Sequence, residues 1–316
     1  MAAVNKYVFP SNSTCYCAES ITEEIMEIYS SLKGLKDDVI YQDPSNHLKT
    51  VFQRLDYLIA QDIDDESAEA ILSNSEFNSA LDVITRFRSM YTAKLEIEHT
   101  KSILKSSDSW EVLKNFAYLP NYLQLAQTEY QGAGLRPGDC VLFLGSGPLP
   151  ISLIVLCHQY GLRGIGIEQE PDRAELSRRV LAKLGLSDQI RIIEGNHSTL
   201  PLKERTELIM VAAQAEPKKE IFDHLANVLP TETKISYRLY DKGLRRLLDT
   251  FYRYELPEPF EEYLRVRPKP PANNTVVFLT TNNIGYISTT DGQLSERCLT
   301  FNDEEMQDIT QSPEIC

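Results

Sequence analysis

Cysteine is scarce in this sequence, and its six cysteines are widely scattered. A small disulfide-stabilised scaffold is therefore excluded, because such scaffolds depend on many closely spaced cysteines. Cys15 and Cys17 have no second Cys or His pair nearby, and the five histidines show no ligand spacing, so we expect no metal site. Long apolar runs are also absent. No stretch of roughly 18 apolar residues is present to span a bilayer.

Positive charge is in deficit, with 32 Lys and Arg residues against 46 Asp and Glu residues. Nucleic acids and anionic membranes select basic surfaces, so neither is expected as a partner. The chain begins MAAVNKYVFPSNS, without the apolar segment of a signal peptide, which predicts a cytoplasmic location. Its 316 residues, 42% of them apolar, are enough to bury a sizeable core.

The apolar pattern changes period near the Pro137-Gly138 turn. From about residue 18 to 130 the spacing is helical and predicts a bundle of about five helices. After the turn, short β-branched runs alternate with helical stretches, which predicts a doubly wound parallel sheet closed by YLRVRP and TVVFLTT. We therefore expect an α/β protein, in which a helical domain precedes a Rossmann-like domain. The expected boundaries are 1–132 for the helical domain, 133–282 for the Rossmann-like domain and 283–316 for an acidic, flexible tail.

The segment FLGSGPLP follows the first predicted strand and precedes an apolar helix, which is the place of a nucleotide-binding turn. Gly145 and Gly147 allow a tight turn and a close approach of the backbone to a ligand. Pro148 and Pro150 remove two N–H donors that the pyrophosphate of NAD would use. The loop therefore favours an adenosine ligand such as S-adenosylmethionine. The expected contacts are Gly145, Ser146, Gly147, Pro148 and Leu149.

Polar side chains follow the next two predicted strands. Glu168 ends the second strand and Glu170 lies two residues further, where an acid accepts hydrogen bonds from a ribose diol. Asn196 follows the third strand and is placed to bond an adenine edge. Phe143 stands where common S-adenosylmethionine methyltransferases carry an acid that helps to hold the methionine end. We therefore expect the methionyl group to be held differently, with another carbon presented for attack.

Three segments carry a family resemblance. GSGPLP with its apolar helix resembles the signature of the nicotianamine synthases and the related opine-metallophore synthases. FAYLPNYLQLAQTEY is similar to a family segment with the pattern F-x-Y-x-x-N-Y-x-x-L-x-x-x-E, and YRLYDKGLRRLL resembles its arginine–glycine–arginine segment. The resemblance covers residues from about 20 to 280. It departs from the family pattern at Glu168/Glu170 and Asn196-His197, where aspartates are usual.

The resemblance implies that S-adenosylmethionine donates its 3-amino-3-carboxypropyl (aminobutyrate) group to an amine, while methylthioadenosine leaves. The product would be nicotianamine or a similar metallophore. A base must deprotonate the acceptor ammonium. Glu98 continues the apolar stripe of a long helix from Leu95, so we expect it to share a face with Phe87 and Tyr91 and to act as the base. Glu96 is the reserve, and the alternative is that Glu98 only closes the stripe.

Tyr122 and Glu129 are seven residues apart and share one face of the next helix. This face is expected to meet the methionyl group or the acceptor, with Glu129 contacting substrate. Tyr122 or Tyr118 would relay the proton or bind a substrate carboxylate. The alternative is that both tyrosines pack between the domains with their hydroxyl groups capped.

Arginines are the expected partners of substrate carboxylates, because a planar guanidinium binds a carboxylate with two bonds. Arg238 and Arg245 are the first choice, and Arg265 and Arg267 are the alternatives. The acceptor stays open between an aminobutyrate unit from S-adenosylmethionine and histidine or another amino acid. Two other functions also stay open, a methyltransferase and a non-catalytic adenosine sensor, while a dehydrogenase fits the loop least.

Overall fold

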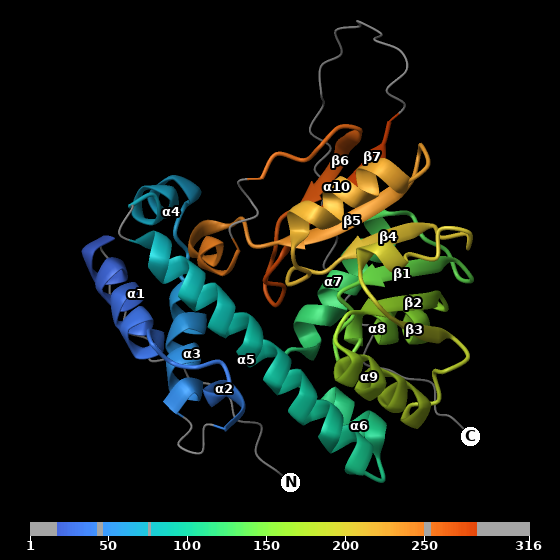
Figure 1. Ribbon diagram of the computed structural model, residues 1–316, viewed down its shortest axis with the longest axis horizontal. Helices are drawn as coiled ribbons and strands as arrows, with labels where there is room; N and C mark the ends of the chain where they lie inside the picture. The colour runs from blue at the N-terminus through green and yellow to red at the C-terminus, as the bar shows by residue number, and fades with distance from the viewer. Residues whose placement is uncertain (1–17, 43–46, 75–76, 250–253, 283–316) are drawn as a thin grey trace, which may run out of the picture. The chain divides into compact units, whose positions relative to one another are not determined.

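A computed structural model describes residues 18–42, 47–74, 77–249 and 254–282 (Figure 1). These residues form one compact unit. Among them, seven helices precede the first strand: α1 (Ala18–Leu32), α2 (Val39–Gln42), α3 (His47–Ile59), α4 (Asp65–Leu72), α5 (Asn78–Lys105), α6 (Ser109–Lys114) and α7 (Leu119–Gly132). The sequence pattern predicts about five, because α2 and α4, with 4 and 8 residues, are too short to show a full apolar stripe.

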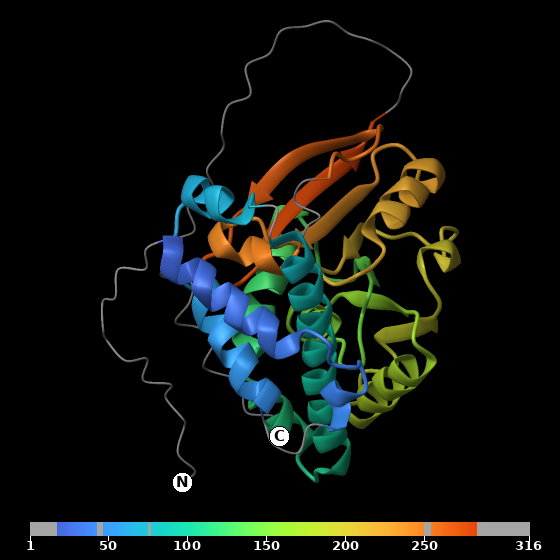
Figure 2. The same cartoon turned by 60° about the vertical axis from the view of Figure 1, so that its left-hand side comes forward.

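The first helices bury a common apolar core. In α1, the residues Ile21, Ile25, Ile28 and Leu32 recur at helical spacing and are all buried. Helix α1 packs against α3 and α5 (Figure 2). Leu244 and Leu247, from the short 3-10 helix η3 (Gly243–Leu248), complete the same core. A segment that follows the fifth strand is therefore part of the helical core.

The second half contains one seven-stranded sheet with the order β3-β2-β1-β4-β5-β7-β6. Its strands are β1 (Cys140–Leu144), β2 (Arg163–Glu168), β3 (Ile190–Glu194), β4 (Leu208–Val211), β5 (Lys234–Leu239), β6 (Phe260–Val266) and β7 (Thr275–Thr281). The first five strands are parallel, and β7 runs antiparallel between β5 and β6. The predicted α/β fold, with helices ahead of a Rossmann-like sheet, is confirmed.

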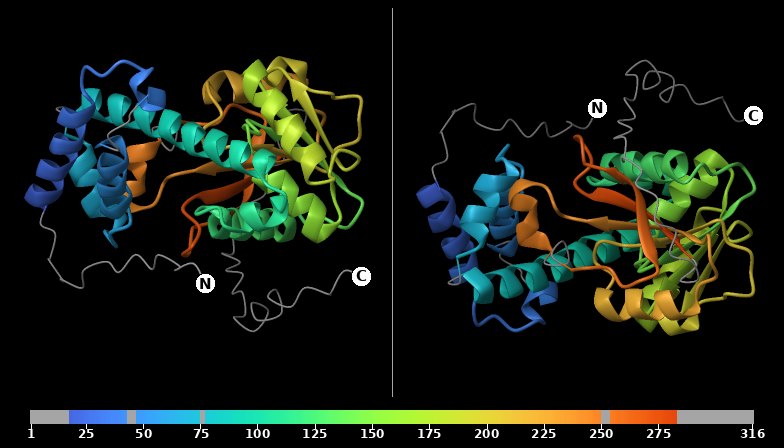
Figure 3. Two further views of the ribbon diagram at one scale, coloured as in Figure 1. Left: turned by 90° about the horizontal axis from the view of Figure 1, so that it is seen from below. Right: turned by 90° about the horizontal axis from the view of Figure 1, so that it is seen from above.

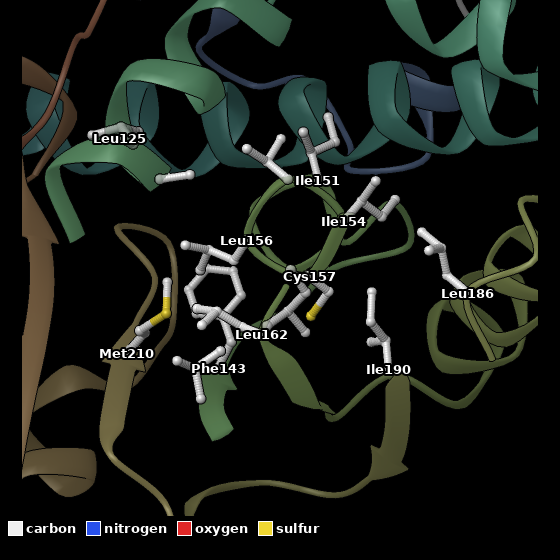
Figure 4. Close-up of a cluster of buried hydrophobic side chains, with 14 of the residues drawn as sticks. Leu125, Phe143, Ile151, Ile154, Leu156, Cys157, Leu162, Leu186, Ile190 and Met210 are labelled. Carbon is white, nitrogen blue, oxygen red and sulfur yellow. The ribbon is translucent and has the colours of Figure 1, made fainter. Parts of the chain in front are cut away.

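Helices cover both faces of the sheet. One face packs against α7, α8 (Ile151–Tyr160) and α9 (Pro171–Lys183) in a single apolar cluster. Figure 4 shows Phe143, Ile190 and Met210 of the strands beside the buried side chains of α8. The opposite face packs against α10 (Lys218–Val228). Between β1 and β4 the strand order reverses, and ligands of such sheets bind at the carboxyl ends of the strands beside this reversal.

Helix α5 connects the two parts. With 28 residues it is long enough to contact α1 at one end and α9 and α6 at the other (Figure 3). Buried Thr100 ties it to the ligand loop, because its hydroxyl donates to the backbone oxygen of Glu96 at 2.8 Å and of Pro148 at 3.3 Å. The C-terminal part of α5 is therefore held against the glycine loop that follows β1.

Candidate active site

A cavity lies where the carboxyl ends of the parallel strands meet α5 and the start of α7. Eleven of the residues that the sequence singles out line this cavity: Glu96, Tyr118, Tyr122, Gly145, Ser146, Gly147, Pro148, Leu149, Glu168, Asn196 and Arg238. Four others, Glu98, Glu129, Glu170 and Arg245, do not. Each of the three segments that resemble the family therefore contributes residues to this cavity. The segments are 116–129, 143–150 and 238–245.

The glycine loop has the backbone form that its sequence predicts. Gly145 and Gly147 have φ values of 80° and 74°, a region that side chains other than glycine rarely adopt. The N–H groups of Gly145 and Ser146 donate to the backbone oxygen of Ile167 at 3.0 and 3.1 Å. A Cβ atom on Gly147 would lie 2.9 Å from the Glu96 carboxylate. The second glycine thus makes room for an acid of α5.

Replacing Gly147 by Ala is expected to weaken binding of the adenosine ligand that the loop predicts by at least about tenfold, because the new methyl group displaces the Glu96 carboxylate. The backbone strain adds about 1 kcal/mol of lost stability. Calorimetric titration would measure ligand binding, and the rate of product release would measure turnover. Gly134→Ala is the matched control, since Gly134 has a φ of 64° and open space around it. Equal binding and turnover in the Gly147 and Gly134 variants would disprove this role of the glycine.

Glu96 and Tyr122 form a hydrogen-bonded pair inside the cavity. The Tyr122 hydroxyl donates to Glu96 Oε1 at 2.9 Å. Burial raises the pKa of Glu96 to about 7, although the hydrogen bond from Tyr122 and the charge of Arg173 act in the opposite direction. Burial and the neighbouring carboxylate raise the pKa of Tyr122 well above its ordinary value. Near neutral pH, Glu96 can therefore accept a proton while Tyr122 keeps its own.

Glu98, which was expected to act as the base, lies outside the cavity. Its side chain is 58% exposed, and its carboxylate is 3.8 Å from Lys94 Nζ. The apolar stripe of α5 through Phe87 and Tyr91 faces the helical core, whereas the cavity is met by another stripe. That second stripe, Arg88, Thr92 and Glu96, advances by four residues each time, so extrapolation of the first stripe misses it.

Arg238 and Glu129 form a buried ion pair. Nε and Nη2 of Arg238 donate to the two Glu129 oxygens at 2.8 and 2.7 Å, and Nη2 also donates to Ser152 Oγ at 2.9 Å. The guanidinium lies 5.2 Å from the centroid of the Phe143 ring. Phe143 of β1 and Arg238 of β5 therefore bring an aromatic ring and a cation to the place where methyltransferases carry an acid. Glu129 holds Arg238 and does not reach the cavity itself.

Most of the remaining predicted residues have structural partners, but Arg245 Nε is buried without a hydrogen-bond partner among the described residues. Both Glu168 oxygens accept backbone N–H bonds, Oε2 from Gly147 at 2.9 Å and Oε1 from Glu170 at 3.0 Å, so this acid also fixes the loop. Glu170 contributes its backbone as the N-cap residue immediately before α9. Arg265 pairs with Asp241 and Glu262, and Arg267 pairs with Asp65, away from the cavity lining. Asn196 accepts a bond from Ser198 N through Oδ1.

Some cavity residues were not singled out from the sequence. They include Arg88, Arg173, Tyr240 and Asn274. The spacing of Arg88 and Thr92 ahead of Glu96 is the signal that points to Arg88. Tyr240 and Asn274 lie in connecting segments, and no local pattern marks them. Within 18–42, 47–74, 77–249 and 254–282, no group of three or more His, Cys, Asp or Glu residues is placed to hold a metal ion. No helix of these ranges is long and apolar enough to cross a membrane.

Known proteins resemble this chain over most of its length. The profile of the family described as nicotianamine synthase protein matches residues 14–284. A crystal structure of a glutamate-to-glutamine mutant of MtNAS in complex with S-adenosylmethionine is 32% identical and has a TM-score of 0.72; the match covers 85% of this chain and 99% of that chain. A complex of MtNAS with MTA and tNA is also 32% identical, with a TM-score of 0.71 and coverage of 85% and 100%.

Curated relatives match a shorter region. The L-histidine 2-aminobutanoyltransferase of Yersinia pestis is 29% identical over 143 residues, which are 44% of this chain and 51% of that enzyme. The enzyme of the same name from Pseudomonas aeruginosa is 22% identical over 132 residues, or 42% and 50% of the two chains. The match thus spans about half the length of these curated relatives.

Proposed function

This chain belongs to the nicotianamine synthase family, and from that premise we propose that it transfers the 3-amino-3-carboxypropyl group of S-adenosylmethionine to an amine. Methylthioadenosine leaves, and nicotianamine or a similar metallophore forms. The observation that carries the proposal is the Glu96–Tyr122 pair, which places a carboxyl group with a pKa of about 7 directly against the glycine loop. A carboxylate in this position can activate an amine beside the bound donor.

Glu96 is the proposed base, and Tyr122 orients it. The acceptor arrives as an ammonium and gives one proton to Glu96. The free amine then attacks Cγ of the methionyl group, and a new N–C bond forms as the C–S bond breaks. The electron pair of the broken bond goes to the sulfonium sulfur, which leaves as the neutral thioether of methylthioadenosine. Because the sulfonium already makes Cγ electrophilic, the protein contributes mainly position and proton removal.

The adenosine end is assigned to the glycine loop and the next two strand ends. Ser146 Oγ lines the cavity and is buried without a hydrogen-bond partner among the described residues, so it is available to a ligand. Glu168 is proposed to accept from the ribose hydroxyl groups, since each of its oxygens accepts one backbone bond and has a further lone pair. Asn196 is proposed to contact the adenine edge through its Nδ2.

Product analysis tests the proposal. Purified protein would be incubated with S-adenosylmethionine, alone and with L-histidine, and the nucleoside released would be identified by mass spectrometry. We expect methylthioadenosine; its release without histidine would indicate that S-adenosylmethionine supplies the acceptor as well. S-adenosylhomocysteine in its place would overturn the proposal and identify a methyltransferase. A cytoplasmic location stays part of the prediction.

A further inference from the structure

The loop between β4 and α10 (residues 212–217) forms part of the cavity wall, and its residues 212–216 line the cavity. This loop lies directly against the glycine loop. A Cβ atom on Gly145 would lie 3.1 Å from the Ala215 Cβ and 3.2 Å from the Ala212 Cβ. The Ala212 N–H also donates to the backbone oxygen of Leu144 at 3.0 Å. The position of the β4–α10 loop therefore determines the space beside the glycine loop.

Lys218, the first residue of α10, is a buried cation. Its side chain is 2% exposed, although lysine is almost never fully buried unless it is paired. The N-terminus of a helix also disfavours a positive charge, because the helix dipole is positive there. Burial and the dipole both oppose an ammonium at this place, so its bonds to oxygen atoms must compensate for them.

The Lys218 ammonium bonds to oxygen atoms of the β4–α10 loop and to one acid further along the chain. It donates to the backbone oxygen of Ala213, to Glu216 Oε1 at 3.4 Å and to Asp249 Oδ2 at 3.3 Å. The Lys218 backbone N–H donates to the other Glu216 oxygen at 3.0 Å. The Glu216 side chain is 63% exposed and that of Asp249 is 4% exposed, so Asp249 is the buried counter-ion. The ammonium thus joins the middle of the loop to a fixed anion.

Asp249 belongs to the segment that completes the helical core. It caps the end of η3, and Leu247 of η3 is buried in that core. The backbone oxygen of Leu247 accepts a bond from the hydroxyl of Thr85 in α5 at 3.0 Å. Helix α5 also carries Glu96. The Lys218–Asp249 pair therefore fastens the β4–α10 loop to the framework that holds the proposed base.

Stability alone does not require this arrangement. Apolar residues of similar volume often replace a buried ion pair without loss of stability. Apolar side chains could not bond to the backbone oxygen of Ala213, however, so the loop would lose its attachment to η3. The arrangement therefore indicates that Lys218 controls where the loop lies.

We propose that Lys218 is a positioning residue for the donor. It holds the β4–α10 loop against the glycine loop, and Asp249 fixes its ammonium, so that the cavity keeps the shape that binds S-adenosylmethionine. This assignment rests on the proposed function, which names the donor. Lys218 itself does not line the cavity and acts through the loop. The pair affects the affinity for the donor and leaves proton removal by Glu96 unchanged.

Lys218→Met tests the assignment, because methionine has a similar length but neither the charge nor the N–H donors. We expect the KM and the Kd for S-adenosylmethionine to rise at least about tenfold, since a hydrogen bond to a charged group is lost. The kcat at saturating donor should stay within about twofold. Calorimetric titration measures the Kd, and the rate of methylthioadenosine release gives KM and kcat.

Lys219→Met is the matched control. Lys219 is the next residue of α10, its side chain is 68% exposed, and its Nζ lies 2.6 Å from an Asp223 oxygen. The same chemical change at this exposed position should leave the KM and the Kd for the donor within about twofold of the wild type. A rise in this variant equal to that in Lys218→Met would overturn the assignment.

The double variant Lys218→Met with Asp249→Leu separates positioning from stability. It removes both buried charges, so its unfolding midpoint in urea should return toward that of the wild type. The KM and the Kd should stay raised, because the bond to Ala213 is still absent. If Lys218→Met does not fold, the double variant decides.

Recovery of donor affinity together with stability in the double variant would overturn the assignment. Unchanged donor affinity in a folded Lys218→Met protein, or a loss in kcat without a change in KM, would also do so. Failure of the proposed function is seen separately, because release of S-adenosylhomocysteine in the product analysis would refute it and would leave the Kd for S-adenosylmethionine measurable.

Discussion

Glu96→Gln is expected to lower the rate of methylthioadenosine release by about 10²–10⁴-fold, the usual contribution of a positioned base. Glutamine has nearly the same shape and still accepts the bond that Tyr122 donates at 2.9 Å, but it cannot take up a proton. Binding of S-adenosylmethionine should therefore change by only a few fold. Single-turnover rates and calorimetric titration of the donor would separate the two quantities.

Glu98→Gln is the matched control for this substitution. It makes the same chemical change two residues further along α5, where the side chain is 58% exposed and lies beside Lys94. Turnover of this variant should stay within about twofold of the wild type. A large loss in Glu98→Gln together with normal turnover in Glu96→Gln would reverse the assignment of the base.

Glu96→Gln should also stabilise the folded protein at neutral and alkaline pH. Burial raises the pKa of Glu96 from 4.5 to about 7. Below pH 4.5 the carboxyl group is protonated in both states, and between 4.5 and 7 only the unfolded chain readily loses the proton, so stability falls as pH rises. Glutamine has no such loss. We expect Glu96→Gln to gain up to about 3 kcal/mol of unfolding free energy above pH 7. The rate of methylthioadenosine release by the wild type should rise with pH through about 7, as Glu96 loses its proton.

Much of the fold could be predicted because its signals are local. Strand segments such as CVLFLG carry β-branched and apolar runs between turn residues, and they appear as β1 and its neighbours. The sharing of a core between α1 and η3 could not be predicted. Leu244 and Leu247 are far from α1 in the sequence, and no periodicity reports which distant element covers an apolar face.

The candidate site was less accessible to sequence reasoning. The glycine loop is a short-range motif, and its residue types predict the positive φ values that Gly145 and Gly147 have where they line the cavity. To choose between Glu96 and Glu98 as the base, one must know which face of α5 meets the sheet. The apolar stripe records the contact with the helical core, and a polar stripe toward a cavity leaves no apolar signal.

Glu129→Gln is expected to cost about 3–5 kcal/mol of unfolding free energy, because it leaves the Arg238 charge buried without its counter-ion. Both side chains are almost fully buried, at 4% and 1% exposure, and two parallel bonds of 2.8 and 2.7 Å join them. Glutamine fills the same space but supplies one oxygen and an N–H₂ group that faces the cation. Urea unfolding at neutral pH would measure the loss.

Glu204→Gln provides the comparison that separates burial from pairing. Glu204 contacts Arg191 at 2.6 Å, as short as the buried bridge, but the two side chains are 54% and 48% exposed. Water screens that pair, so its loss should cost less than about 1 kcal/mol. Similar costs for the two variants would contradict the account given of Arg238. If the costs differ as expected, the double variant Glu129→Leu with Arg238→Met should recover much of the lost stability, because it removes the stranded charge, while it changes the cavity wall beside Tyr122.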